Sequence, residues 1–224
     1  METHISPEII TVHHPRSPIA EAYRSLRTNL EFSSLDRPLR TMVITSPGPG
    51  EGKSTVLVNL GVVIAQAGKK VILADCDLRR PSLHEIFGVS NDRGITTMVV
   101  DEEAMKNPPL MQTGVENLFL LPSGPLPPNP AELLASRRME EIIRRLTETV
   151  DMVLFDAPPA VAVTDAIVLA SKVDGVLLVI SAGQTKKEMA RRAKDLLEKV
   201  NARIIGSVLN NAQIDVSLQR YYIP

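Results

Sequence analysis

Tryptophan is absent from the 224-residue sequence, and aromatic residues make up only 3% of it. A single cysteine, Cys76, excludes an intrachain disulfide and suits a reducing compartment. No apolar run reaches the ~18 residues expected of a membrane span, and the first residues show no secretory signal pattern. Neither sign of charge dominates, since 25 Lys+Arg face 26 Asp+Glu. Nucleic-acid binding through bulk charge is therefore not expected, because it needs a surplus of cations.

Short runs rich in Val, Ile and Leu alternate with helical stretches from residue 41 onward. Continuous apolar strands are typical of a parallel sheet that is buried on both faces. The sequence therefore predicts a single α/β domain, with a mainly parallel sheet flanked by helices on both faces. Expected strands are 41–45, 70–74, 118–121, 151–155, 176–180 and 203–209; expected helices include 17–30, 53–67, 131–147, 163–171 and 185–200.

The ends of the chain differ from this central region. Residues 1–16 are polar, contain two prolines and show no periodicity, so an extended N-terminal arm is expected. Residues 17–212 form the expected domain, and residues 213–224 an expected C-terminal tail. Two of the three tyrosines, Tyr221 and Tyr222, lie in that tail.

A glycine-rich turn, S-P-G-P-G-E-G-K-S-T at residues 46–55, follows the first expected strand and opens a helix. Backbone N–H groups in such a turn can bind phosphate oxygens, and the helix N-terminus adds partial positive charge. Lys53 is placed to reach the β- and γ-phosphates and the Ser54 hydroxyl to hold Mg²⁺. The pattern departs from the standard P-loop at Pro47, where glycine is usual. The predicted nucleotide-binding residues are Gly48, Gly50, Glu51, Gly52, Lys53, Ser54 and Thr55.

Acidic residues follow two other expected strands. Asp75 and Asp77 come after one strand, and Asp156 after another. Ligands of an open parallel sheet bind beyond the carboxyl ends of its strands, so these carboxylates are expected near Lys53. A metal or catalytic role for at least two of them is expected, as in the Mg²⁺-holding Asp of P-loop enzymes. The residues alone do not say which one is a base.

Six segments carry a resemblance to a known family, the bacterial tyrosine kinases of capsule and exopolysaccharide synthesis. The resemblance is to the P-loop kinase domain of that family and covers nearly the whole chain. The segments are E-A-Y-R-S-L-R-T-N-L (21–30), P-G-E-G-K-S-T (49–55), D-C-D-L-R-R-P-S-L-H (75–84), P-P-N-P-A-E-L-L-A-S (127–136), F-D-A-P-P (155–159) and V-L-N-N (208–211).

The resemblance implies an ATP- and Mg²⁺-dependent protein-tyrosine kinase. Within it, Lys53 and Asp75 match catalytic positions, with Asp75 as the tyrosine-activating residue. Asp77 matches a catalytic position that faces Mg²⁺, and Asp156 matches a second Mg²⁺-holding position. Asn210 matches the position that contacts the adenine edge. The departure at Pro47 is shared by the family's phosphate loop.

Two further features of the family have counterparts here. Glu21, Arg24 and Arg27 match a helix motif that mediates ring assembly, so a homo-oligomer, in the form of a ring, is implied. On the residues alone, a solvated charged face is the simpler interpretation of these three. Tyr221 and Tyr222 match the start of a C-terminal tyrosine cluster, which implies autophosphorylation in trans.

The resemblance also implies partners and a location. It implies a cytoplasmic kinase that a membrane adaptor's cytoplasmic segment activates at the inner face of the plasma membrane, with other proteins as tyrosine substrates. Two alternatives remain open. One is a P-loop ATPase of the partition or septum-placement type, although that group carries an early loop lysine where this chain has Gly48. The other is a nucleotide-gated scaffold without catalysis.

Overall fold

The computed structural model describes residue 6 and residues 8–33 and 37–213. Within these ranges, no helix has both the length and the apolar character that crossing a membrane requires. The strands are β1 (Thr41–Thr45), β2 (Val71–Asp75), β3 (Met111–Gln112), β4 (Leu118–Leu121), β5 (Met152–Asp156), β6 (Gly175–Ser181) and β7 (Ile204–Asn210). The helices are α1 (Ile10–His13), α2 (Pro18–Phe32), α3 (Lys53–Gln66), α4 (Leu83–Ile86), α5 (Ile95–Val100), α6 (Glu102–Lys106), α7 (Pro130–Ala135), α8 (Arg137–Thr147), α9 (Asp165–Ala170) and α10 (Lys187–Lys199).

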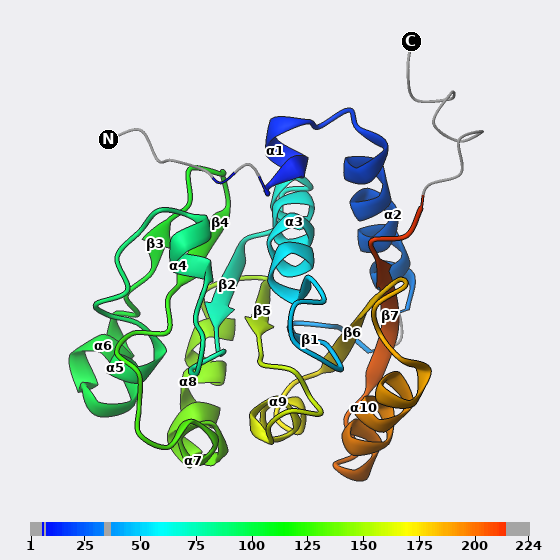
Figure 1. Ribbon diagram of the computed structural model, residues 1–224. Coiled ribbons are helices and arrows are strands. Elements are labelled where there is room, and N and C mark those ends of the chain that lie inside the picture. Colours follow the sequence, from blue (N-terminus) through cyan, green and yellow to red (C-terminus); the bar gives the residue numbers. More distant parts are fainter. Residues whose placement is uncertain (1–5, 7, 34–36, 214–224) are drawn as a thin grey trace.

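The strands form one seven-stranded sheet in the order β3-β4-β2-β5-β1-β6-β7 (Figure 1). Every neighbouring pair is parallel except β3–β4, which is antiparallel. The predicted α/β domain of the P-loop type, with a mainly parallel sheet, is therefore confirmed. The phosphate loop lies at the carboxyl end of β1, where the chain enters α3 before it returns to β2.

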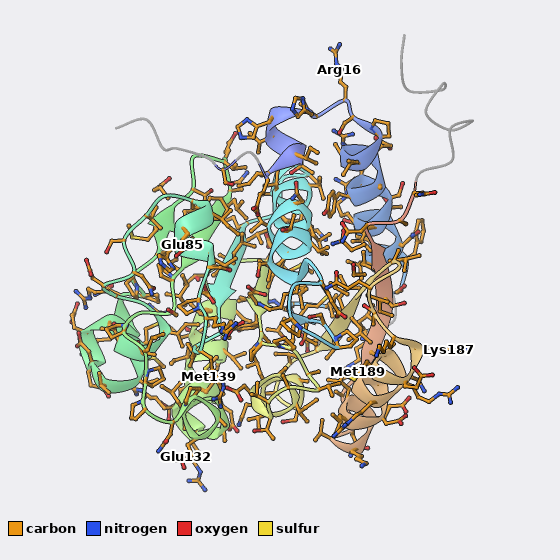
Figure 2. The ribbon with its side chains drawn as sticks, in the orientation of Figure 1. Arg16, Glu85, Glu132, Met139, Lys187 and Met189 are labelled. Carbon is orange, nitrogen blue, oxygen red and sulfur yellow. The ribbon has the colours of Figure 1, made fainter. Side chains whose placement is uncertain are left out.

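Hydrophobic side chains form a core on each face of the sheet. Successive β1 residues divide between the two cores, since Val43 belongs to one and both Met42 and Ile44 belong to the other. The first core contains residues of α8, α9 and α10, and the second contains α3. Polar side chains such as Arg16 and Glu132 lie at the margin of the molecule, where Figure 2 labels them. Helices on both faces bury the central strands, which explains their uninterrupted apolar sequences.

Two sequence-based expectations are wrong in detail. Residues 131–147 were expected as one helix, but the chain breaks at Ser136, which has a ψ of 156°. The Ser136 side chain accepts a hydrogen bond from the backbone N–H of Met139 at 3.2 Å, so it caps α8 as a new helix. The short elements β3, α4, α5 and α6 were not expected at all.

The expected N-terminal arm is also not fully extended. Residues Ile10–His13 form the short helix α1, and Ile9 and Thr11 are completely buried. Asn59 of α3 holds this segment, because its side-chain oxygen accepts hydrogen bonds from both the backbone N–H and the hydroxyl of Thr11. The segment therefore packs on the helix that follows the phosphate loop.

Candidate active site

The phosphate loop connects β1 to α3 and depends on glycine for its shape. Gly50 and Gly52 have φ values of 72° and 86°, in the left-handed region that favours glycine. A Cβ at Gly52 would lie 2.1 Å from Nδ2 of Asn210, so a larger residue would strain the backbone and displace the Asn210 side chain. The N-terminus of α3 directly follows this turn, and its free backbone N–H groups and dipole favour a bound anion.

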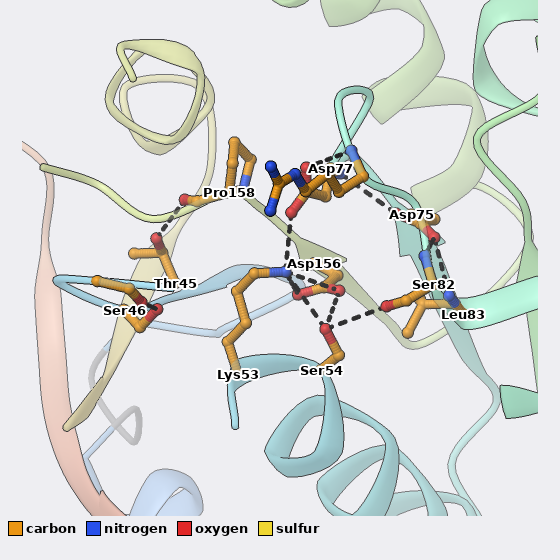
Figure 3. Close-up of polar contacts among 12 residues, drawn as sticks. Thr45, Ser46, Lys53, Ser54, Asp75, Asp77, Ser82, Leu83, Asp156 and Pro158 are labelled. Carbon is orange, nitrogen blue, oxygen red and sulfur yellow. Dashed lines mark hydrogen bonds and ion pairs between the residues drawn. The ribbon is translucent and has the colours of Figure 1, made fainter. Parts of the chain in front are cut away.

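Four polar side chains from three parts of the chain meet beside this loop (Figure 3). Nζ of Lys53 lies 3.0 Å from Oδ2 of Asp77 and 3.1 Å from Oδ1 of Asp156. The hydroxyl of Ser54 donates a 2.6 Å hydrogen bond to Oδ2 of Asp156. Asp77 follows β2 and Asp156 ends β5. The predicted proximity of the strand-end carboxylates to Lys53 is therefore confirmed for Asp77 and Asp156.

Asp75 lies at the same edge but has different contacts. Its Oδ1 accepts a hydrogen bond from the backbone N–H of Asp77 at 3.2 Å. Its Oδ2 accepts two more, from the backbone N–H groups of Ser82 and Leu83, both at 3.0 Å. The residue is completely buried. Asp75 therefore holds together the loop that carries Asp77, and both of its oxygens are engaged in doing so.

Burial dominates the titration of this cluster. Desolvation, and then the nearby charge of Asp156, raise the pKa of Asp75 to about 7, against the opposing effect of its backbone hydrogen bonds and of Lys53. Desolvation also raises the pKa of Asp156, although Lys53 opposes that change. Burial alone would lower the pKa of Lys53, but the charges of Asp156 and Asp77 outweigh it and leave that pKa raised. Lys53 is therefore a permanent cation at neutral pH.

Cys76 lies between two of these acids and is fully buried. Desolvation first, and then the charges of Asp75, Asp156 and Asp77, raise the pKa of its thiol well above the ordinary value. A thiol in this state stays protonated and is a poor nucleophile. The expectation that Cys76 is a packing residue rather than a reactive one is consistent with this environment.

The oxygen atoms near Lys53 fit a magnesium ion that arrives with a phosphate ligand. Mg²⁺ usually keeps several waters and binds one or two protein carboxylates together with substrate phosphates. Ser54 and Asp156 supply a hydroxyl and a carboxylate in direct contact, and Asp77 lies on the other side of Lys53. No group of three or more His, Cys, Asp or Glu side chains is arranged to hold a metal within the ranges that the structure describes. The donor set therefore suits a magnesium–nucleotide complex better than a free ion.

Glu51 is buried within the phosphate loop, with 4% of its surface exposed. Its Oε2 accepts a 3.0 Å hydrogen bond from the backbone N–H of Gly48, and its Oε1 accepts a 2.6 Å bond from the Thr185 hydroxyl. The carboxylate therefore shapes the loop and ties it to the segment between β6 and α10. Sequence reasoning missed Thr185, although its position just after a strand at the same edge is a usable signal.

Three other residues lie around the loop. Nδ2 of Asn210 donates a 3.0 Å hydrogen bond to the backbone oxygen of Glu51, so Asn210 stabilises the loop backbone. The Thr55 hydroxyl lies 3.5 Å from Oε2 of Glu8, in the N-terminal segment. Sequence reasoning also missed Ser82, whose hydroxyl lies 3.4 Å from that of Ser54.

The residues expected to mediate assembly lie on α2, away from this cluster. Nη1 of Arg24 lies 2.7 Å from Oε2 of Glu21, and its Nη2 donates to the backbone oxygen of Pro15. Nη1 of Arg27 donates a 3.1 Å hydrogen bond to the backbone oxygen of Val63 in α3. All three side chains thus have partners within one copy of the chain. The expected phosphorylation sites, Tyr221 and Tyr222, lie outside the described residues.

Comparison with known proteins decides the family. The chain is 44% identical to the tyrosine-protein kinase YwqD of Bacillus subtilis (strain 168), over 92% of this chain and 86% of that protein. It is 38% identical to the putative tyrosine-protein kinase CapB of Staphylococcus aureus, over 97% of this chain and 95% of that protein. The chain belongs to the bacterial tyrosine-protein kinase family.

Solved structures and a broader family model agree with this membership. The kinase domain of the Escherichia coli tyrosine kinase ETK matches with a TM-score of 0.88 and 32% identity, over 97% of this chain and 84% of that one. The chimerical protein CapA2B2 also matches with a TM-score of 0.88, at 35% identity, over 94% and 93% of the two chains. The ParA family model, described as NUBPL iron-transfer P-loop NTPase, matches residues 39–219. The tyrosine-kinase family is thus one branch of a wider P-loop NTPase fold.

Proposed function

We propose that this chain transfers the γ-phosphoryl group of ATP to tyrosine hydroxyl groups. The observation that carries the proposal is the contact of Lys53 with Asp77 and Asp156 beside the phosphate loop, 3.0 and 3.1 Å away. A permanent cation there can neutralise charge on the transferred group, which is the main demand of phosphoryl transfer. The kinase names of relatives that are 38% and 44% identical favour this reaction over hydrolysis.

The residues divide into distinct tasks in this proposal. The phosphate loop, Gly48 to Thr55, binds the phosphates through backbone N–H groups, and Lys53 contacts the β- and γ-phosphates. Ser54 and Asp156 hold Mg²⁺, with Asp77 adjacent. When bound, the metal would neutralise the negative charge that develops on the phosphates. Asn210, which donates a hydrogen bond to the loop backbone at Glu51, contacts the adenine edge.

The reacting tyrosine is assigned to Asp77 instead of Asp75, which changes the expectation from the family resemblance. Both Asp75 oxygens accept backbone hydrogen bonds. Asp77 accepts one, at Oδ1 from the backbone N–H of Arg80, and its Oδ2 contacts Lys53, the residue that reaches the phosphates. The bond between the γ-phosphorus and its bridging oxygen breaks as a bond to the tyrosine oxygen forms. The tyrosine proton then passes to the Asp77 carboxylate. Asp75 acts as a positioning residue, through the loop that carries Asp77.

The wider setting of the kinase rests on the family resemblance. Residues 17–212 act as the kinase unit, and Tyr221 and Tyr222 in the tail 213–224 are phosphorylated by a neighbouring copy. Glu21, Arg24 and Arg27 contribute to assembly of that homo-oligomer, as a ring. A membrane adaptor's cytoplasmic segment activates the kinase at the inner membrane face, and the reaction regulates capsule or exopolysaccharide synthesis through further tyrosine substrates.

A phosphotyrosine assay tests the reaction. The full chain is incubated with ATP and Mg²⁺, with and without the adaptor's cytoplasmic segment, and is probed for phosphotyrosine and free phosphate. We expect phosphotyrosine on the native chain and on Lys199→Ala, a matched surface control, but none on Lys53→Ala. The Tyr221→Phe/Tyr222→Phe variant should lose its own labelling yet still phosphorylate the tail of a Lys53→Ala chain.

The other possible outcomes identify the alternatives. Free phosphate without phosphotyrosine, with the adaptor segment present, would show an ATPase of the partition type. Binding of ATP with neither product under the same conditions would show a nucleotide-gated scaffold. Either result contradicts the kinase proposal.

A further inference from the structure

A groove of about 510 Å³ lies between α10 and the last two strands of the sheet, on the side opposite to α2. Its floor is apolar and includes Leu178 and Ile180 of β6 and Ile204 of β7. Three cations of α10 stand along one side of it, and Asp195 is the acidic residue in its lining. The cations are Lys187, Arg191 and Lys194. The groove thus combines an apolar base with a positively charged rim.

Two of these cations form no close ion pair among the described residues, although Asp195 lies in the same lining. Lys194 pairs with Glu198 at 2.9 Å. Lys187 and Arg191, by contrast, form no ion pair with any residue in the described part of the chain, and both are exposed. Figure 2 shows Lys187 at the outer margin of α10. The rim therefore offers two adjacent cationic groups, one helical turn apart, for an external anion.

A glycine keeps the floor of this groove open. Gly206 lies in the middle of β7, where a glycine weakens a strand and often marks the close approach of a ligand or another backbone. A Cβ at this position would meet no atom within 4 Å. The fold therefore has room for a side chain here, and packing within the described residues does not require glycine.

We infer that this groove binds a phosphotyrosine of the chain's own C-terminal tail, residues 214–224, with Tyr221 as the anchoring residue. Phosphotyrosine combines an aromatic ring with about −1.5 to −2 charge at pH 7. The ring would pack on the apolar floor, and the phosphate oxygens would accept hydrogen bonds from Lys187 and Arg191. The inference rests on the proposed function, because that reaction supplies the phosphorylated tail.

The length of the tail is compatible with binding to its own groove. The last described residue, Gln213, follows β7, the strand that lines the groove. Tyr221 lies eight residues further on, which extended chain can span over roughly 26–29 Å. The tail has to reach back along β7 towards Gly206 in the groove floor. Gly206 lies four strand residues before Asn210, a distance of only about 13 Å. β7 is also an edge strand of the sheet, so an extended segment can pair with its free backbone groups.

Binding of a synthetic phosphopeptide tests the inference without any need for kinase activity. The probe is a fluorescent peptide of residues 214–224 that carries phosphotyrosine at position 221, and the host is the full chain with Tyr221→Phe and Tyr222→Phe. Fluorescence anisotropy at low salt should show saturable binding, with the unphosphorylated peptide at least about tenfold weaker. Equal affinity for the two peptides would overturn the inference.

Substitutions in the host locate the binding site. Lys187→Gln/Arg191→Gln should weaken phosphopeptide binding at least about tenfold, whereas Arg192→Gln/Lys199→Gln, on the same helix but outside the groove lining, should change it less than twofold. Gly206→Val should fill the floor and abolish binding, while the melting temperature stays equal or rises, because valine favours strands. If either the double variant or the folded Gly206→Val chain binds as tightly as the host, the groove is not the site.

Two further experiments test whether the bound phosphate belongs to the chain's own tail or to a lipid. A full chain that carries phosphotyrosine at 221, prepared by semisynthesis, should bind added phosphopeptide at least about tenfold more weakly at concentrations where it is monomeric. Unchanged affinity would overturn binding of the chain's own tail. Vesicles of phosphatidylglycerol and phosphatidylcholine provide the last comparison. If Lys187→Gln/Arg191→Gln reduces vesicle binding and leaves phosphopeptide binding intact, the groove recognises lipid and the inference is wrong.

Discussion

The charges around Lys53 and the charges along α2 are both ion pairs, but they lie in opposite environments. The side chains of Lys53, Asp77 and Asp156 are 14%, 7% and 0% exposed. Those of Arg24 and Glu21 on α2 are 32% and 41% exposed. Burying ions costs several kcal/mol each unless partners compensate, whereas an exposed i,i+3 pair gains only ~0.2–0.5 kcal/mol. Burial of the Lys53 cluster therefore costs free energy of folding, and stability alone does not explain it. The exposed pair on α2 carries almost no such cost.

The largest expected effect is a loss of catalytic rate that distinguishes Asp77 from Asp75 within the buried cluster. Asp77→Asn should lower the rate of phosphotyrosine formation by about 10²–10³-fold, similar to the loss of one preorganised electrostatic group, because Asp77 contacts Lys53. Asp75→Asn should instead lower the free energy of unfolding by about 1–3 kcal/mol, since an amide cannot accept at every backbone N–H around it. Rates and denaturant unfolding measured on both variants give the comparison.

The reverse pattern would contradict the assignment of Asp77. If Asp75→Asn abolishes the rate with unchanged stability while Asp77→Asn stays active, Asp75 is the residue that meets the tyrosine. Glu116→Gln, an exposed acid remote from the cluster in sequence, is the control and should change neither quantity.

A smaller effect is expected at the hydrogen bonds of Glu51. Glu51→Gln should raise the KM for ATP about tenfold, with a smaller change in kcat, because it disturbs the loop before phosphate binds. Thr185→Val should have a similar effect, and the double variant should cost less than the sum of the two, as expected for residues in contact. Additive effects in this double-mutant cycle would show that the 2.6 Å contact does not position the loop.

The sequence predicts most of the strands and loops that carry this cluster. It predicts few of the side-chain contacts that hold the cluster in place. Strand 118–121 and the lysine of the phosphate loop follow from local composition and pattern, and both are in place. Thr185 contacts Glu51 from 134 positions away, and Thr11 contacts Asn59 from 48 away. Such contacts depend on the packing of finished elements, which no local pattern reveals.

The wrong boundary at Ser136 has a local cause. The apolar pattern on both sides is helical, so periodicity alone joined 131–147 into one helix. Serine competes with the backbone for hydrogen bonds and caps the next helix, and that preference prevailed here. The roles of Asp75 and Asp77 were equally open, because they depend on which oxygens face backbone N–H groups.

On α2, a difference of about 1 kcal/mol is expected between two arginines. Arg27→Ala should lower the free energy of unfolding by about 1 kcal/mol, because it removes the hydrogen bond to Val63. Arg24→Ala should change it by less than about 0.5 kcal/mol, as is typical of partly exposed pairs. Denaturant unfolding and light scattering, measured together, separate stability from assembly. Equal losses of stability would show that the two side chains are equivalent supports of α2.

The last expected effect is absent at neutral pH and concerns Tyr23, a partly buried side chain on the same helix. Desolvation raises its pKa to about 12. Because the unfolded chain releases this proton near pH 10 and the folded chain does not, stability should fall as the pH rises from about 10 towards 12. With no tryptophan present, ultraviolet titration of the Tyr221→Phe/Tyr222→Phe variant reports Tyr23 alone. A midpoint near 10 in the folded protein would contradict this burial effect.

The pairing of Lys53 with two carboxylates has a consequence for the order in which ligands arrive. The ammonium group acts as a resident counterion in the place where a divalent ion would otherwise accumulate. A bare magnesium ion would have to displace it against like-charge repulsion. A metal already chelated by a triphosphate brings net negative charge, which draws the lysine away from its acids and releases them. The pairing of Lys53 in this way favours the metal–triphosphate complex over the bare metal ion.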